Sequence, residues 1–278
     1  MPFTPTSPRI SYRLYGSHGP PVLLLMGLGM RGVVWRPQFE GLRDDHRLVT
    51  IDNRGIGDSE AVPGRWTMKD MADDAIRVLD ALGWESAHVV GVSMGGMYAQ
   101  ELALAVPGRV RSLTLIATHA GGPFRFVPPG EGIRGFLGTN FLPGDRRFGA
   151  LASLLYPNDF LRMVDRDALL ARMADQLGTR ADGNIRLQQL SAVAGHDTRD
   201  RLHRLGALST LVVTAGRDAL VAPRLQRHLA ASIPGAEHLC FDKAGHGLIF
   251  QCARALNRQL RRHFEKNEPI LPPVRIHA

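Results

Sequence analysis

The stretch 89–97 constrains the fold of this chain more than any other segment. It reads Val-Val-Gly-Val-Ser-Met-Gly-Gly-Met, so an apolar run stops at Ser93 between Gly91 and Gly95, and a helical pattern follows. If the run is a buried strand, the chain must reverse at Ser93, and only glycine fits where the two backbones approach. The turn would expose the Ser93 hydroxyl at a helix N-terminus, whose free N–H groups stabilise a developing negative charge. A serine placed there can act as a nucleophile; the alternative is a Gly-rich turn with a serine N-cap.

The composition is that of an ordinary globular chain, with 278 residues, 44% hydrophobic and 22% charged. No apolar run approaches the roughly 20 residues that span a bilayer. Residues 1–8 have neither the basic start nor the apolar core of a signal peptide. We therefore expect one domain with an insertion, located in the cytoplasm. Cys240 and Cys252 fit neither a metal motif nor a redox motif, and we expect them to be buried thiols.

The net charge of +8 comes almost entirely from arginine, because the only lysines are Lys69, Lys243 and Lys266. A basic protein of this kind can bind nucleic acid. The arginines are scattered among acidic residues, however, and basic and aromatic residues do not alternate as they do in nucleic-acid-binding modules. We expect a basic surface with no nucleic-acid or membrane partner, and the sequence leaves the oligomeric state open.

Strand-like and helical patterns alternate along most of the chain. The expected strands are 10–14, 22–26, 48–51, 87–92, 110–116, 211–215 and 237–241. Helices are expected between them, including one that Thr67 caps and Gly83 ends, and a last helix covers 248–264. This alternation predicts an α/β protein with a doubly wound, mostly parallel sheet that helices cover on both faces.

The alternation stops at Gly121 and resumes after Gly195. The segment between them is punctuated by proline and glycine and has no strand-like pattern. Its helical patterns cover 147–156, 161–177 and 185–193. We therefore predict that residues 121–195 form a helical cap, inserted in a core made of 1–120 and 196–278.

The cap segment is rich in phenylalanine. It holds six of the eleven in the chain, which are Phe124, Phe126, Phe136, Phe141, Phe148 and Phe160. A small helical subdomain needs some of them for its own core, and the others could line an apolar pocket over the nucleophile. We take Phe124 and Phe141 as candidates for substrate contact. Met26, beside the nucleophile, and His119, which follows the strand next to that of Ser93, are two more.

Residues 27–32 spell Gly-x-Gly-x-x-Gly, and Asp52 ends the next apolar run, which is the pattern of a dinucleotide site. In such a site the helix begins within the glycines, which would put Pro37 in its second turn. Proline there removes a hydrogen bond and clashes with a carbonyl, so we expect neither a nicotinamide nor a flavin cofactor. We also expect no metal site. A Gly-rich loop also offers a free N–H near a nucleophile.

Two further residues complete a catalytic pattern. Asp218 and His246 each follow an expected strand, and the carboxyl ends of parallel strands share one sheet edge with Ser93. A serine hydroxyl needs a base whose pKa is near neutrality, and imidazole is that base when a carboxylate fixes its tautomer. We therefore predict Ser93 as nucleophile, His246 as base and Asp218 as the acid. Asp197 is the alternative acid, but it is better explained as the N-cap of a helix through Leu205.

With these residues in place, the sequence resembles the α/β-hydrolase fold family over nearly its whole length. The matching motifs are Gly91-Val92-Ser93-Met94-Gly95, Asp52-Asn53-Arg54-Gly55-Ile56-Gly57-Asp58-Ser59, Gly216-Arg217-Asp218 with Pro223, and Gly245-His246-Gly247. The resemblance implies that 121–195 is the cap domain and that the backbone N–H groups of Leu28 and Met94 form an oxyanion hole. The family usually has His-Gly before the first of these donors, whereas this chain has Met26-Gly27. Methionine there is similar to methyl esterases that act on aromatic polyketides.

The site and the resemblance together imply a serine hydrolase that cleaves a carboxylic ester or lactone through an acyl-enzyme on Ser93. The apolar cap suggests a small to medium, largely apolar small-molecule substrate. Enol-lactone opening, carbon–carbon bond hydrolysis and cofactor-free haloperoxidase or perhydrolase chemistry use the same three residues, so these alternatives stay open. The alternative from another class is a non-catalytic ligand-binding protein on this scaffold.

Overall fold

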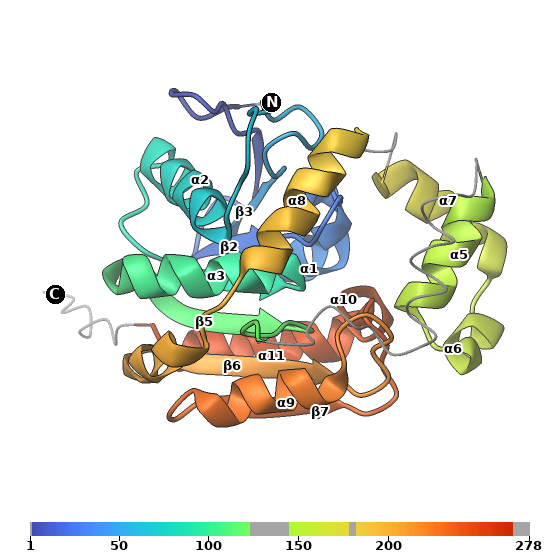
Figure 1. Cartoon of the computed structure of the whole chain (residues 1–278). Coiled ribbons are helices and arrows are strands. Elements are labelled where there is room, and N and C mark those ends of the chain that lie inside the picture. The colour runs from blue at the N-terminus through green and yellow to red at the C-terminus, as the bar shows by residue number, and fades with distance from the viewer. Residues whose placement is uncertain (1, 123–144, 178–181, 269–278) are drawn as a thin grey trace, which may run out of the picture.

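The computed structural model describes residues 2–122, 145–177 and 182–268. Within these ranges a central sheet lies between two layers of helices, and a further group of helices stands beside it (Figure 1).

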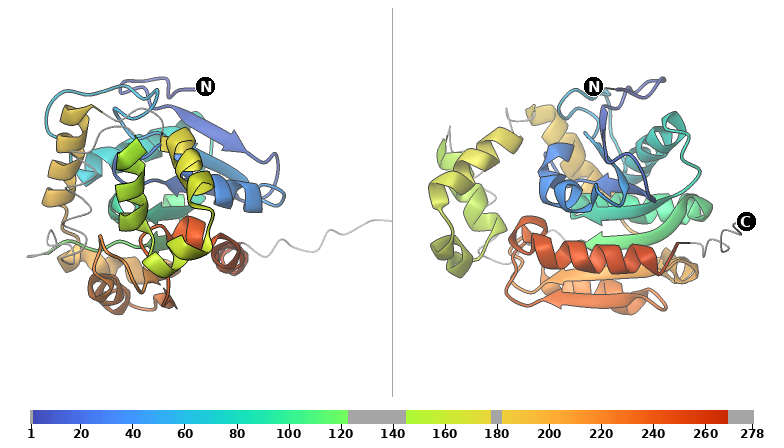
Figure 2. Two further views of the ribbon diagram at one scale, coloured as in Figure 1. Left: turned by 90° about the vertical axis from the view of Figure 1, so that its right-hand side faces the viewer. Right: turned by 180° about the vertical axis from the view of Figure 1, so that it is seen from behind.

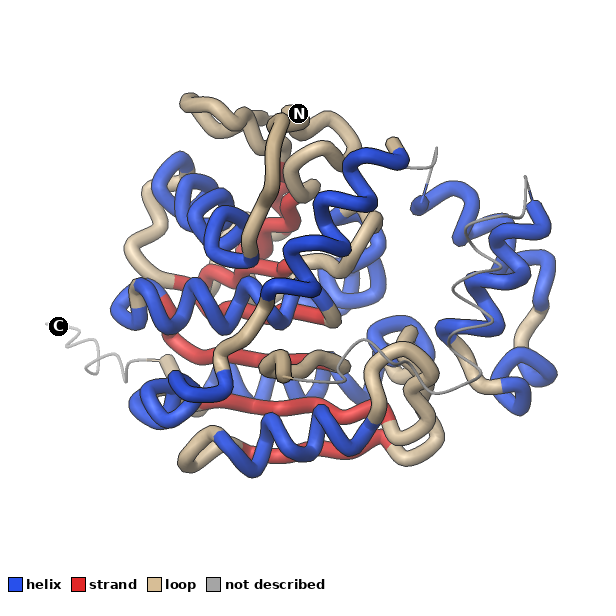
Figure 3. The backbone as a smooth tube through the Cα atoms, in the orientation of Figure 1, coloured by secondary structure: helices blue, strands red, loops and turns tan. Residues whose placement is uncertain are grey.

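The described residues form one sheet of seven strands in the order β1-β3-β2-β4-β5-β6-β7. The strands are β1 (Tyr12–Tyr15), β2 (Pro21–Leu25), β3 (Arg47–Ile51), β4 (Ala87–Val92), β5 (Val110–Ile116), β6 (Thr210–Ala215) and β7 (Glu237–Phe241). β1 runs antiparallel to β3, and every other neighbouring pair is parallel. The predicted mostly parallel sheet is therefore confirmed, and Figure 3 shows its strands in red, enclosed by helices.

Helices cover both faces of this sheet, which confirms the doubly wound arrangement (Figure 2). One layer consists of α2 (Met68–Ala81), α3 (Met94–Ala105) and α9 (Pro223–Ser232), and the other of α1 (Arg36–Leu42), α10 (Leu248–Gln251) and α11 (Ala253–Glu265). Short 3₁₀ helices lie at Gly32–Trp35, Pro107–Arg109 and Arg199–Ala207. Successive residues of β2 point to opposite layers: Leu23 and Leu25 join the core under α2 and α3, and Leu24 joins the core under α1 and α11.

Three helices, α5 (Asp145–Leu155), α6 (Asn158–Met163) and α7 (Arg166–Leu177), pack round a small core of their own. Its buried side chains are Phe148, Ala152, Tyr156, Leu169 and Met173. This group stands apart from the sheet, whereas α8 (Gly183–Gly195) lies along the layer of α2 and α3 (Figures 1 and 2). Ile185 and Ala192 of α8 belong to the main core. The predicted cap segment therefore includes one helix that packs on the core, and the boundaries 121–195 stay a prediction.

Two predicted helices are each broken in two, so their predicted extents are wrong. The sequence predicts one helix over 161–177, but the chain is extended at Val164, and Asp165 begins the next helix by accepting a hydrogen bond from Ala168 N–H at 3.0 Å. It also predicts one helix over 248–264, but Cys252, at φ −116° and ψ 24°, separates α10 from α11. An aspartate that binds a nearby backbone N–H interrupts a helix without altering its hydrophobic pattern.

Two local predictions have different outcomes. Thr67 caps α2 as predicted, since its hydroxyl accepts from Asp70 N–H at 3.2 Å and the Asp70 carboxylate accepts from Thr67 N–H at 2.8 Å. The prediction of buried thiols is wrong, because Cys240 and Cys252 are only half-buried. Desolvation nevertheless raises the pKa of both thiols.

A buried histidine, His88, is the second residue of β4. It therefore lies at the opposite end of that strand from Ser93. His88 is 0% exposed and stacks on Phe264 at a ring distance of 4.5 Å. Its Nδ1 lies 2.8 Å from Ser112 Oγ and its Nε2 lies 2.8 Å from Glu268 Oε1. Burial lowers the pKa of His88 to about 4, although the Glu268 carboxylate opposes the shift; the charges of Arg111 and His46 lower it further.

We expect this histidine to make the protein less stable in mild acid. An unfolded histidine has a pKa near 6.5, so below that pH the unfolded chain takes up a proton that folded His88 rejects. The stability that His88 contributes is fully present above about pH 6.5 and is lost as the pH falls toward 4, by up to ~3 kcal/mol. Urea unfolding between pH 7 and pH 4.5 measures this loss. His88→Gln should flatten the pH dependence, whereas His18→Gln, at an exposed histidine, should not; equal slopes in both variants would contradict the assignment.

Candidate active site

Ser93 lies at the turn between β4 and α3, in a backbone conformation that side chains rarely adopt, with φ 55° and ψ −123°. Its N–H donates to Ile116 O at 2.9 Å and its carbonyl accepts from Thr118 Oγ1 at 2.7 Å. A Cβ at Gly91 would overlap the Gly95 carbonyl, and a Cβ at Gly95 would overlap the Leu25 carbonyl. The two glycines are therefore required by close backbone approach, as predicted, and the Ser93 side chain stays partly exposed.

His246 and Asp218 form a buried pair, 7% and 3% exposed, with Nδ1 of the imidazole 2.8 Å from Oδ2 of the carboxylate. The other carboxylate oxygen accepts from Leu220 N–H at 2.8 Å and Val221 N–H at 2.9 Å. Because a carboxylate can only accept, Nδ1 carries the hydrogen and Nε2 is left as a proton acceptor. The pair thus has the tautomer that a general base toward a serine needs.

Backbone hydrogen bonds join the three strand ends that carry these residues. Ser93 follows β4 and bonds to the last residue of β5, Ala117 N–H donates to Val213 O of β6, and Arg217 N–H donates to Ala244 O after β7. This edge of the sheet faces the group of α5, α6 and α7 in Figure 1. Ser93 Oγ and His246 Nε2, both in described residues, do not hydrogen-bond to each other. Such contacts often shorten only when substrate binds.

The loop after β2 packs directly on Ser93. A Cβ at Gly27 would lie 3.3 Å from Ser93 Cβ and 3.7 Å from Ser93 Oγ. Leu28 comes next in this loop, and Met94 is the first residue of α3. Within the described ranges neither of their N–H groups donates to another group. The two amides predicted as an oxyanion hole are therefore uncommitted, and one of them, Leu28 N–H, follows the glycine that packs on Ser93.

The Gly-rich loop differs from a dinucleotide site in the way the sequence predicts. The first α-helix after it begins at Arg36, beyond all three glycines, with Pro37 in its first turn. Asp52 accepts a hydrogen bond from Gly32 N–H at 2.6 Å and lies 3.7 Å from the Arg31 guanidinium. Burial raises the pKa of this carboxyl, while the Gly32 hydrogen bond opposes the shift. Asp52 therefore holds the loop in shape.

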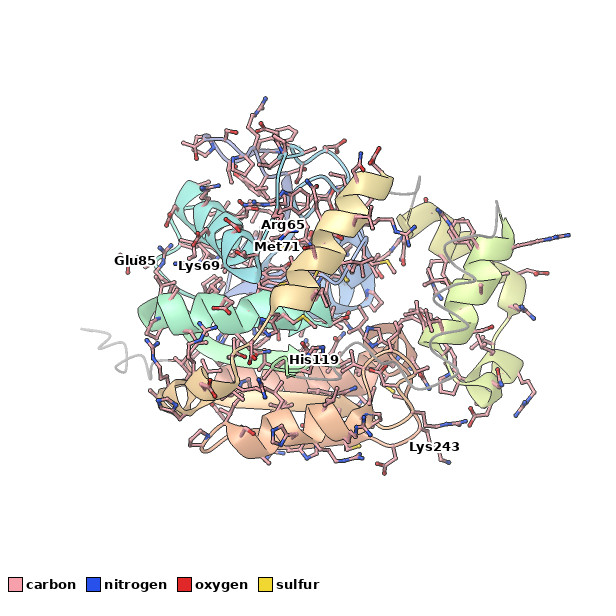
Figure 4. All side chains as sticks on the ribbon, viewed as in Figure 1. Arg65, Lys69, Met71, Glu85, His119 and Lys243 are labelled. Atoms are coloured by element: carbon pink, nitrogen blue, oxygen red, sulfur yellow. The ribbon has the colours of Figure 1, made fainter. Side chains whose placement is uncertain are left out.

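The candidate substrate residues have mixed positions. Met26 is 2% exposed and packs in the core under α1 and α11. His119 is 4% exposed, accepts from Gly121 N–H at 2.9 Å through Nδ1, and lies at the end of β5 (Figure 4). Phe124 and Phe141 lie outside the described residues. Substrate contact by these four residues stays a prediction, and the buried placement of the first two does not favour it.

Asp197, the alternative acid, pairs with an arginine. It is exposed, forms an ion pair with Arg199 at 2.8 Å, and accepts from Arg199 N–H at 3.2 Å. The residue at the N-cap position of the 3₁₀ helix is Thr198, without a side-chain cap. The prediction that Asp197 is the N-cap is therefore wrong by one residue, although its carboxylate still accepts a backbone hydrogen bond at the start of that helix, and Asp218 is the carboxylate that contacts His246.

Two glutamines that the sequence analysis did not identify support the candidate site. Gln226 is 0% exposed; its Nε2 donates to Asp218 Oδ2 at 2.8 Å and its Oε1 accepts from Ala215 N–H at 2.9 Å. Gln251 accepts from Gly245 N–H at 2.9 Å and donates to Lys243 O at 3.0 Å, which braces the histidine loop. Both lie on helices, where a glutamine usually faces solvent.

The small helical group touches the core at the histidine loop. Gly247 N–H donates to Leu155 O at 2.9 Å, and the ring of Tyr156 lies 6.1 Å from that of Phe250 in an edge-to-face arrangement. An exposed ion pair joins Arg217 to Asp159 at 2.6 Å. The end of α5 therefore sits directly over the loop that carries His246.

A cavity of about 300 Å³ lies elsewhere, between the start of α2 and the end of α8. Its lining includes Trp66, Lys69, Glu101 and Arg201 but none of the three predicted catalytic residues. In the described part of the chain no group of three or more His, Cys, Asp or Glu side chains is placed to hold a metal ion. Nor does any described helix have the length and apolar character needed to cross a membrane.

A mostly parallel sheet with helices on both faces is the architecture of many hydrolases, and comparison with known proteins agrees with that class. The family model described as the alpha/beta hydrolase fold matches residues 20–251. The chain belongs to the α/β-hydrolase fold family.

The names of individual relatives refer to hydrolysis of different kinds of bond. The chain is 34% identical over 259 residues to "Putative carbamate hydrolase RutD" of Azorhizobium caulinodans, covering 90% of this chain and 92% of that protein. It is 28% identical over 263 residues to the 2-hydroxy-6-oxononadienedioate/2-hydroxy-6-oxononatrienedioate hydrolase of Paraburkholderia phymatum, covering 92% and 90%. A thermophilic esterase from Thermogutta terrifontis has a similar structure, with a TM-score of 0.79, 25% identity, and coverage of 96% and 98%. These relatives support hydrolysis of a small molecule and leave the bond open.

Proposed function

We propose that this protein is a serine hydrolase that cleaves a carboxylic ester or lactone through an acyl-enzyme on Ser93. The observation that carries the proposal is the buried His246–Asp218 pair, 2.8 Å apart, on the same sheet edge as a serine held at φ 55°. The strained turn presents the hydroxyl, and the pair supplies a base of the correct tautomer. These are the parts that acyl transfer requires.

In the first half of the reaction, Ser93 Oγ attacks the carbonyl carbon and its proton passes to His246 Nε2. The carbonyl oxygen becomes an oxyanion, which the N–H groups of Leu28 and Met94 stabilise. The imidazolium, stabilised by Asp218, then gives the proton to the departing alkoxide, which leaves as the alcohol. In the second half, His246 Nε2 takes a proton from water, whose oxygen attacks the acyl carbon. The bond from that carbon to Ser93 Oγ then breaks, the proton on His246 passes to Ser93 Oγ, and the acid is released.

A carbamate is the second candidate substrate, because the relative named for carbamate hydrolysis is 34% identical over 90% of this chain. Its carbonyl carbon is less electrophilic than that of an ester, since the nitrogen lone pair is delocalised into it. The same serine chemistry applies, however. Side-by-side rates on a matched aryl ester and N-alkyl aryl carbamate would decide between the two.

The experiment that tests the proposal is labelling with a fluorophosphonate, followed by mass spectrometry of the digested protein. Phosphonylation should fall on the peptide that contains Ser93 and should be lost in Ser93→Ala. Thr118, whose hydroxyl already donates to Ser93 O, offers a matched control, since Thr118→Val should still be labelled. An unlabelled wild-type protein would favour the binding-protein alternative, and labelling at another serine would overturn the assignment of the nucleophile.

We expect activity on aryl esters to rise from acetyl to butyryl or hexanoyl and then fall. Leu28 follows Gly27, which packs on Ser93, and its side chain is apolar and only partly buried. Each methylene buried in an apolar acyl site contributes about 0.8 kcal/mol, which is about fourfold in kcat/KM, until the site is full. A series of p-nitrophenyl esters measures this. A steady decline from acetyl onward would argue against an apolar acyl pocket and would favour the lactonase and perhydrolase alternatives.

A further inference from the structure

A glutamine of α8 reaches the loop that carries the first predicted oxyanion donor. Gln189 is 0% exposed, and its Oε1 accepts a hydrogen bond from Gly29 N–H at 2.8 Å. Gly29 lies one residue after Leu28 and has a positive φ of 68°. The two partners are 160 residues apart in the chain. The contact therefore ties the oxyanion loop to a helix that no local interaction would bring there.

The other side-chain hydrogen bonds that the described residues make with the backbone of this loop are at its two ends. At the start, Met26 O accepts from Asn53 Nδ2 at 3.2 Å, and at the end Gly32 N–H donates to Asp52 Oδ1 at 2.6 Å. Within the loop, Met30 N–H donates to Gly27 O at 3.4 Å, a long hydrogen bond. Among the described residues, Gln189 thus supplies the side-chain hydrogen bond at the middle of the loop, next to the amide that must face the substrate oxygen.

The orientation of the Gln189 side chain supports this assignment. Its Nε2 is buried and has no hydrogen-bond partner among the described residues. An amide turned the other way would place two donors, Nε2 and Gly29 N–H, against each other, so Oε1 must face the loop. A buried donor without a partner is unfavourable and calls for an explanation. Here the Gly29 contact dictates the orientation, at the expense of the Nε2 donor.

Helix α8 is itself firmly seated. A Cβ at Gly55 would lie 2.6 Å from Ile185 Cδ1, so this turn packs directly against the helix. Ala192 lies in the main core. The carbonyl of Gln189 is therefore held by a rigid element, which is what a group that positions a catalytic loop requires.

We propose that Gln189 is a positioning residue that holds the oxyanion loop so that Leu28 N–H faces the reacting carbonyl oxygen. This inference rests on the proposed function. It acts through the backbone: Gln189 fixes Gly29, and the peptide between Leu28 and Gly29 fixes the orientation of the donor. Loss of the contact should weaken stabilisation of the transition state, where the oxygen is charged, more than binding of the uncharged substrate.

The test compares Gln189→Met with Gln188→Met. Gln188 is the preceding residue of the same helix, and its side chain donates to Gly64 O instead of to the oxyanion loop. We expect Gln189→Met to lower kcat about 10-fold with KM within about twofold of wild type, because a loosened donor is partly lost. Gln188→Met should leave both constants near those of wild type. Affinity for an aryl trifluoromethyl ketone should fall by the same factor as kcat/KM. Ser93 Oγ adds to the carbonyl carbon of this ketone, the serine proton passes to His246, and the ketone oxygen becomes an oxyanion.

A second measurement does not depend on activity. Hydrogen exchange at the Gly29 amide should be faster in Gln189→Met than in wild type and unchanged in Gln188→Met. Equal kcat in the two variants, or a loss that appears only in KM, would overturn the positioning role, and so would unchanged exchange at Gly29. Failure of the proposed function is distinguishable, because it would appear in the wild-type protein as absence of Ser93 labelling, whatever the exchange result.

Discussion

Ser93→Ala and His246→Ala should each lower kcat for ester hydrolysis by on the order of 10⁵–10⁶, and the double variant should be no worse than either single variant. The physical reason is that the two side chains serve one covalent route. A hydroxyl without a base is a poor nucleophile, and a base without the hydroxyl has no proton to take. Once either is gone the route is closed, so the second substitution removes nothing more.

The measurement is kcat on an activated aryl ester for the wild type, both single variants and the double variant, with unfolding temperatures to show that each is folded. His119→Ala is an informative comparison, because that histidine lies at the same sheet edge but its Nδ1 accepts from Gly121 N–H. It should retain most of the wild-type kcat. Additive losses in the double variant would mean that Ser93 and His246 act independently, and the catalytic assignment would then be wrong.

The elements that sequence patterns predict best are those whose pattern and punctuation agree. The strand predicted at 87–92 matches β4, and the helical pattern predicted after Ser93 matches α3, because a buried run, two required glycines and a helical pattern all indicate the same turn. Asp218 and His246 could be predicted from the strands that precede them, since the carboxyl ends of parallel strands meet at one edge. The expected strand arrangement was therefore enough to select the candidate triad, without knowledge of any contact between its members.

The supporting glutamines could not be predicted, because their burial is created by tertiary packing. Gln226 and Gln189 lie on helices whose sequences place them among ordinary surface residues. Gln226 becomes buried because Asp218 lies against α9, and Gln189 because α8 packs over a loop 160 residues away. A hydrophobic pattern records which face of a helix is apolar, but not which polar group meets a partner across an interface.

The helical insertion shows a different limit. Its helical character was predicted, and Phe148 lies in the small core of α5 and α7 as the subdomain hypothesis requires. Which of its helices pack on the main core was not predicted: α8 belongs with the main core through Ile185 and Ala192. Amphipathic helices have similar patterns whether they pack on a sheet layer or on each other, so a pattern cannot assign the partner.

Asp218→Asn should leave the fold intact and lower kcat by on the order of 10³–10⁴. In the present arrangement Asp218 accepts hydrogen bonds from two backbone N–H groups, from Gln226 Nε2 and from His246 Nδ1. Asparagine can still accept from the backbone through its carbonyl, which keeps the turn. Its NH₂ group would then face His246 and Gln226, where it can only donate. The imidazole would then adopt the other tautomer, with an unprotonated Nδ1 facing the amide and the hydrogen on Nε2. It could no longer take the serine proton.

Asp197→Asn is the matched control, because that carboxylate is exposed and pairs with Arg199 rather than with a histidine of the site. Its kcat should stay within about twofold of wild type, since asparagine near a helix start is about as favourable as aspartate. Both variants should be measured across pH 5–9 alongside their unfolding temperatures. A loss of activity confined to Asp197→Asn would move the acid to that residue. A near-normal kcat in Asp218→Asn would show that the buried pair orders the loop after β7 without taking part in proton transfer.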